Sequence, residues 1–146
     1  MQSGGQIQSE LARAETAFRE LQTKLDNIRT HLAEKKREQE ELDGQRHTLE
    51  RTGDINRLMA IKQRSIALDK SIHELKHTEV DCLQRIDSAK RYLDGLTDRL
   101  DKLRKEAASL AEKISTDQVP EDLLPQIKVS LRRVQMQIES LAGAES

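Results

Sequence analysis

The sequence predicts an all-α fold: an antiparallel coiled coil in which two shorter helices fold back on one long central helix, giving an elongated rod. Apolar residues recur at alternating spacings of three and four, the pattern of a helix with one buried stripe. Glycines and prolines that favour turns fall between these stretches. The chain has only one Phe, one Tyr and no Trp, too few large side chains for the core of a round domain.

The longest repeat runs from residue 58 to residue 114. Fifteen of its seventeen inward positions are apolar, and only Ser65 and Glu79 interrupt it. We expect Glu79 to form a polar layer and to reach either water or a base such as Lys24. The repeat predicts a helix over about 54–116, and its seam includes Leu68, Ile72, Leu75, Ile86, Leu93, Leu96, Leu100 and Leu103.

The same spacing before and after this stretch predicts two further helices, over about 6–50 and about 122–142, within a single coiled-coil domain of residues 1–146. Residues 1–5 are small and polar, and we expect them to be disordered.

Two short segments mark the predicted turns between the helices. Gly53 suits the first turn and Asp54 can cap the helix that follows, although Gly44 is an alternative stop. Pro120 suits the second turn, and Asp122 is a candidate cap for the third helix.

Two registers of the first two helices satisfy the apolar pattern. If facing residue numbers add up to 107, the bend centres on residues 53 and 54, and Phe18 faces Ala89. If they add up to 100, the connection is longer, and Lys35 faces Ser65. The pattern does not choose between them.

The predicted helix lengths favour a particular arrangement. The first and third helices together match the length of the central one, so we expect each to cover a different part of it. Their free ends, at Ile7 and Leu141, should then meet beside the central helix near residues 93–100.

The overall composition excludes several classes of function. A net charge of −1 gives no general attraction to nucleic acid or to an anionic membrane. No apolar run is long enough to span a bilayer, so we expect no membrane insertion. Cys82, the sole cysteine, permits no internal disulfide, and no targeting signal is visible. We therefore expect a cytoplasmic location.

One motif matches an enzyme signature. The stretch from His73 to His77 reads H-E-x-x-H, the zinc-binding pattern of helical metallopeptidases. Leu75 lies in the seam, however, which places both histidines on the outer face without a third ligand or a walled pocket. We expect no metal site, no cofactor and no catalytic residue.

Two basic clusters are candidates for nucleic-acid contact. The first comprises residues 35–37 with Lys62 and Arg64, and the second comprises Lys128, Arg132 and Arg133. Acidic neighbours dilute the first cluster, and no aromatic residue is placed to stack on a base. Nucleic-acid binding is therefore the third hypothesis.

A second apolar row accompanies the seam of the central helix. A wider stripe is expected where a helix meets more than one neighbour, and it predicts that two hairpins pack into a homodimer. Val129 and Met136 form a smaller candidate contact on the third helix. The row, called the flank row below, consists of Ile55, Met59, Ile66, Val80, Leu83, Ala108 and Ala111.

These observations favour a non-enzymatic protein-interaction module that acts as a scaffold, spacer or adaptor and self-associates. The alternative is a helical-hairpin chaperone or export accessory protein, whose exposed flank would bind client proteins.

Overall fold

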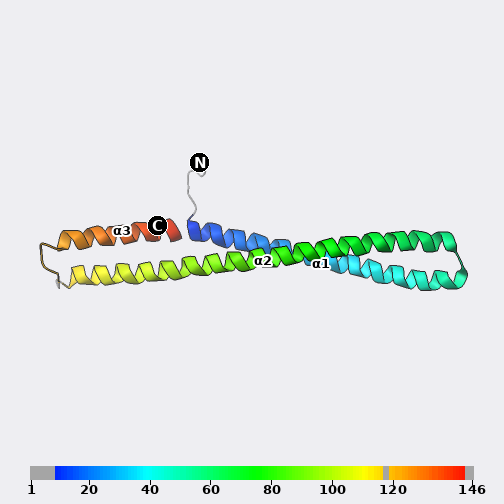
Figure 1. The fold of residues 1–146 in the computed structure, drawn as a ribbon. Coiled ribbons are helices and arrows are strands. Elements are labelled where there is room, and N and C mark those ends of the chain that lie inside the picture. Colours follow the sequence, from blue (N-terminus) through cyan, green and yellow to red (C-terminus); the bar gives the residue numbers. More distant parts are fainter. Residues whose placement is uncertain (1–8, 117–118, 144–146) are drawn as a thin grey trace, which may run out of the picture. The chain divides into compact units, whose positions relative to one another are not determined.

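The computed structural model describes residues 9–116 and 119–143, and this part of the chain forms three helices packed antiparallel, with no strand among the described residues (Figure 1). Helix α1 spans Glu10–Thr52, α2 spans Ile55–Ser115 and α3 spans Leu124–Ala142. The central helix α2 is continuous over 61 residues. The predicted fold class is confirmed. Residues 1–5, expected to be disordered, lie outside the described residues.

The chain divides into two compact units, and α1 and α2 contribute to both. The first unit comprises Met1–Arg19 and Ser88–Ser146, and the second comprises Glu20–Asp87. In the second unit, α1 packs along α2. In the first unit, α2 packs against the beginning of α1 and against residues 134–142 of α3.

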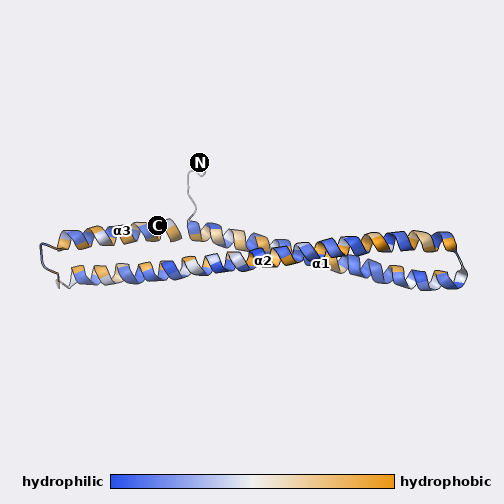
Figure 2. Ribbon diagram, viewed as in Figure 1, coloured by the Kyte–Doolittle hydropathy of each residue, from blue (hydrophilic) through white to orange (hydrophobic). Residues whose placement is uncertain are grey.

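The apolar seam accounts for the burial in both units. Every described position of the three repeats is buried or half-buried, whereas the outward positions are mostly polar (Figure 2). Leu75, Ile86 and Leu93 are half-buried. The fully buried seam residues of α2 are Leu68, Ile72, Cys82, Leu96, Leu100 and Leu103.

A two-residue turn joins α1 to α2. Gly53 adopts a positive φ of 72°, which favours glycine over residues with a Cβ atom. The Asp54 carboxylate accepts a hydrogen bond from the Arg57 amide at 3.2 Å and so caps α2. Helix α1 continues through Gly44, which is therefore a glycine in a helix interior.

These two glycines should respond oppositely to the same substitution. Gly44→Ala should stabilise the fold by about 0.5–1 kcal/mol, because a methyl group there meets nothing within 4 Å and alanine favours the helix. Gly53→Ala should destabilise by about 1 kcal/mol because of the positive φ. Denaturant unfolding of both variants measures the two effects. Equal shifts in the same direction would contradict this turn.

Polar contacts between α1 and α2 fix the register in the second unit. Gln39 donates a hydrogen bond to Asp69, and the Arg29 guanidinium pairs with Glu79 at 3.1 Å. In each pair the residue numbers add up to 108, next to the register of 107, whereas a total of 100 would separate each pair by about two turns. The Cys82 thiol donates to the Leu21 carbonyl at 3.4 Å, and this pair, like Glu38 and Arg64, adds up to a value between the two registers.

Glu79 reaches a base as expected, but the base is Arg29 and not Lys24. In this register Glu79 faces Ile28, so the adjacent Arg29 is the nearest long cation, and it forms the ion pair.

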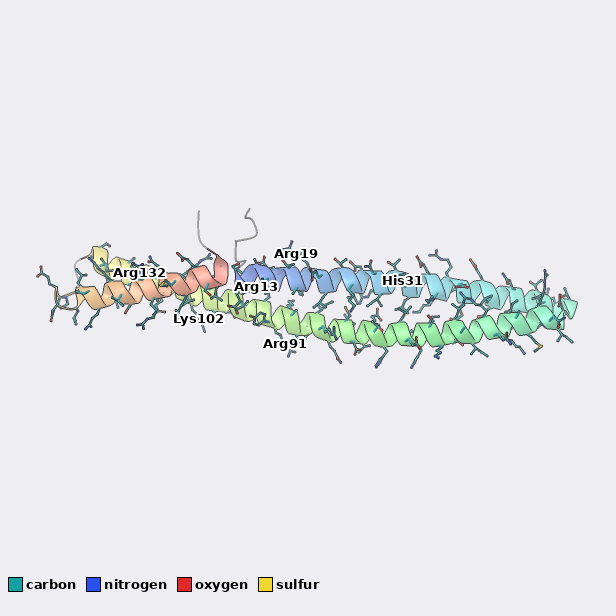
Figure 3. All side chains as sticks on the ribbon, turned by 90° about the horizontal axis from the view of Figure 1, so that it is seen from above. Arg13, Arg19, His31, Arg91, Lys102 and Arg132 are labelled. Atoms are coloured by element: carbon teal, nitrogen blue, oxygen red, sulfur yellow. The ribbon has the colours of Figure 1, made fainter. Side chains whose placement is uncertain are left out.

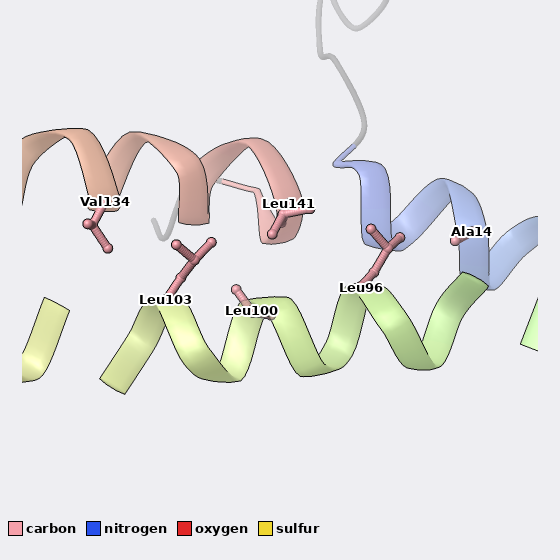
Figure 4. Packing of buried hydrophobic residues seen from close by; sticks show 6 residues of the cluster. All are labelled: Ala14, Leu96, Leu100, Leu103, Val134 and Leu141. Carbon is pink, nitrogen blue, oxygen red and sulfur yellow. The ribbon is translucent and has the colours of Figure 1, made fainter. Parts of the chain in front are cut away.

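In the first unit, the beginning of α1 and the end of α3 meet over α2. Leu96, Leu100 and Leu103 rise from α2 into a cluster with Ala14 of α1 and with two residues of α3, Val134 and Leu141 (Figure 4). The Ile7 end of the expected junction lies outside the described residues.

The terminal residues of the two helices also touch. A Cβ atom at Gly143 would lie 3.6 Å from the Ser9 Cβ atom. The Ser9 hydroxyl accepts a hydrogen bond from the Ala12 amide and caps α1. The positive end of the α1 dipole therefore adjoins the negative end of α3, a favourable arrangement.

The predicted cap of α3 by Asp122 is wrong. The Leu123 amide donates to the Pro120 carbonyl, which forms a turn that leads directly into the helix. Leu123 occupies the N-cap position with near-helical angles, and no side chain caps this end. Pro125 lies in the first turn, where its missing N–H costs little.

Tyr92 bridges α2 and α1 on the outside of the first unit. Its hydroxyl donates to a carboxylate oxygen of Glu10 at 2.7 Å. This hydrogen bond, with a smaller effect of desolvation, raises the pKa of Tyr92 above its ordinary value of 10.0.

Candidate interaction surface

The flank row of α2 exposes large apolar side chains in the second unit. Ile55 and Ile66 are each 69% exposed, Met59 is 56% exposed, Val80 is 49% exposed and Leu83 is 41% exposed. Their residue numbers differ by four, seven, fourteen and three, which places them in one row along α2 beside the seam. Five such residues on one side of one helix are more than the scattered apolar residues of an ordinary surface.

Helix α1 has no counterpart to this row. None of its described residues is an exposed large hydrophobic residue, and Figure 2 shows the part of α1 beside the start of α2 as mostly hydrophilic. The excess of apolar surface is therefore a property of α2.

Ile66 lies at the rim of a groove between α1 and α2. Arg46 occupies a seam position opposite Ile61, and its Nε atom is buried without a hydrogen bond, 3.8 Å from the Glu50 carboxylate. A charged residue in the seam leaves this layer less filled than its neighbours. The groove is lined by Leu42, Asp43, Arg46, Ile61, Lys62, Ser65 and Ile66.

A second groove lies near the turn. It is open to solvent, and its lining combines an arginine and a glutamate with small and apolar side chains. Its residues are Glu41, Gly44, Gln45, Thr48, Leu49, Arg57, Ala60 and Ile61. Neither groove contains histidine or cysteine.

The structure places the H-E-x-x-H motif on the outer surface. His73, Glu74 and His77 are all exposed, and Leu75 is half-buried in the seam. Over residues 9–116 and 119–143, no group of three or more His, Cys, Asp or Glu side chains is arranged to hold a metal ion.

The basic clusters are partly neutralised or dispersed. Arg64 donates two hydrogen bonds to Glu38, at 2.7 and 2.9 Å, so this base of the first cluster is paired. In α3, Arg132 extends from the helix surface (Figure 3), where it and Arg133 are exposed. These arrangements are typical of a charged helix surface.

The remaining sequence-predicted contacts lie on the first unit. Val129 is 60% exposed and Met136 is 61% exposed on α3. Ala108 and Ala111 of α2 are exposed as well. Leu123, which the sequence reasoning did not single out, is 44% exposed. It stands outside the repeat, and an isolated leucine beside a turn gives no periodic signal.

Comparison with protein-family models, curated proteins and solved structures finds no match for this chain. Within the described helices, none is both long enough and apolar enough to cross a membrane.

Proposed function

We propose that this chain is a non-enzymatic interaction module that binds protein partners through the flank row of α2 and self-associates through the same surface. The observation that supports it most is the exposure of Ile55, Met59, Ile66, Val80 and Leu83 on α2, while α1 exposes no large apolar residue.

Burial of the flank row would offset the cost of association. Complete burial of an Ile, Leu, Val or Met side chain contributes about 1.5–3 kcal/mol. Because the five residues are already partly covered, about 1 kcal/mol each is a reasonable gain on dimerisation. In a two-fold interface each copy contributes the same five residues, so ten side chains are buried and the gain is about 10 kcal/mol. This gain is comparable with the cost of association.

The arrangement of the helices suits a scaffold. Helix α2 is held along its seam by α1 in one unit and by α1 and α3 in the other. The flank row is therefore presented on a helix whose other side is already packed. A preorganised surface loses little conformational entropy on binding.

Introducing charge into the flank row should abolish self-association. We expect the double substitution Val80→Asp and Leu83→Asp to weaken dimerisation at least 100-fold, because burying unpaired carboxylates is unfavourable. The native chain should sediment as a dimer at tens of micromolar and the variant as a monomer with unchanged helicity by circular dichroism.

A matched control places the same charges on the other side of α2. Ala67 and Thr78 are exposed and lie on the opposite flank of the seam by helical spacing. The double variant Ala67→Asp and Thr78→Asp should remain a dimer. Identical sedimentation of the native chain and both variants would refute the proposal.

A further inference from the structure

Near His73, charged residues lie between the apolar residues of the flank row on the same side of α2. This pattern of charged and apolar residues determines how a second copy could bind. Within Glu20–Asp87, the positions between Ile66 and Val80 on this side of α2 are Asp69, His73 and Lys76, and all three are exposed. Ile66 and Val80 are each seven residues, or about two turns, from His73. Asp69 precedes His73 by four residues, and Lys76 follows it by three.

We propose that the partner of this surface is a second copy of the chain, bound antiparallel, with the two-fold axis near His73 of α2. This inference rests on the proposed self-association and adds its geometry. A two-fold axis there places Ile66 of each copy against Val80 of the other, so apolar side chains face each other. It also places each Asp69 beside the Lys76 of the other copy, which gives two pairs of opposite charges.

The complementary pattern is limited to the positions nearest the axis. Met59 and Lys62 lie fourteen and eleven residues before His73, and Leu83 and Asp87 lie ten and fourteen residues after it. The same axis places Met59 opposite Asp87 and Lys62 opposite Leu83 of the other copy, so the complementary match is confined to Ile66, Asp69, Lys76 and Val80.

A parallel arrangement in register would have the opposite effect. Each residue would face its own copy, so Lys62, Asp69 and Lys76 would each meet a like charge, which disfavours association. Charge complementarity thus selects the antiparallel dimer.

Mixed cross-linking tests the direction of the two copies. In a Cys82→Ala background, which removes the only native thiol, Ile66→Cys and Val80→Cys chains with different tags are mixed and treated with a short bifunctional maleimide. We expect cross-linked heterodimers in the mixture and little cross-linking of either variant alone. A mixture of Ala67→Cys and Thr78→Cys chains, on the other flank, serves as the control and should stay uncross-linked.

Charge exchange provides a second, independent readout. Lys76→Asp alone should weaken dimerisation about tenfold, because each Asp69 would then face an aspartate. The double variant Asp69→Lys and Lys76→Asp should restore the affinity of the native chain, and because Asp69 also accepts a hydrogen bond from Gln39 of α1, the stability of each variant is measured beside its affinity. In a parallel dimer the second substitution would bring no such rescue.

The possible outcomes separate the two proposals. Heterodimeric cross-links with charge rescue support the antiparallel dimer. A dimer in which residue 66 cross-links to its own copy overturns the antiparallel geometry and leaves the proposed function standing. A native chain that is monomeric at tens of micromolar overturns both.

Discussion

Leu68→Ala should destabilise the fold by about 3 kcal/mol, which is among the largest effects expected for one truncation in this chain. Leu68 is 1% exposed and lies in the seam of α2 facing Gln39 in the observed register. Removing its methyl groups loses their transfer free energy and leaves a cavity between two helices that are held mainly by a single stripe.

Equilibrium unfolding in urea, monitored by circular dichroism, measures this loss. Met136→Ala is the matched control, because Met136 is also a large helical residue but is 61% exposed. We expect its effect to stay below about 0.5 kcal/mol. A loss below about 1 kcal/mol for Leu68→Ala would mean that this part of the seam is not packed as described.

Leu141→Asp should detach the end of α3 from α2. Leu141 is 3% exposed and belongs to the cluster of the first unit with Leu96 and Leu100. A carboxylate at this position would be buried without a partner, and we expect a cost of about 3–5 kcal/mol or the release of α3 into solvent.

The control for this substitution is Ser140→Asp, one residue earlier on the exposed side of α3. Both variants place an acid near the helix C-terminus, where the dipole disfavours it, so their difference reports burial. Limited proteolysis should cut Leu141→Asp within residues 119–143 much faster than Ser140→Asp. Equal cleavage rates would contradict the packing of α3 on α2.

The apolar repeat was sufficient to predict the helices and the seam. Leu68, Ile72 and Leu100 occupy inward positions because spacings of three and four place them on one side of a helix. The repeat also placed Ile66 and Val80 beside the seam, and both are exposed. These positions can be predicted from the sequence because the side of a helix on which a residue lies depends only on local helical geometry.

The repeat could not determine which layers face each other. Shifting one helix by seven residues preserves the apolar pattern, so totals of 100 and 107 were equally compatible with it. The choice depends on particular long-range contacts, such as Gln39 with Asp69 and Arg29 with Glu79. For the same reason, Lys24 was the wrong partner for Glu79.

The third helix began differently from the sequence prediction because its cap depends on the preceding turn. Asp122 has the residue type of a cap. The hydrogen bond from Leu123 to Pro120 nevertheless makes residues 120–123 a turn that enters the helix directly. Local composition alone cannot distinguish these two ways of starting a helix.

The central claim is that α1 and α3 cover different parts of α2 and meet over it, and one cross-link tests this most directly. In a Cys82→Ala background, cysteines replace Ser9 and Gly143, whose Cβ positions are 3.6 Å apart, within the range for a disulfide. Oxidation in dilute solution should give a monomeric, intramolecular disulfide with altered mobility on a non-reducing gel. Thiols that remain free, or disulfides that form only between chains, would contradict the account.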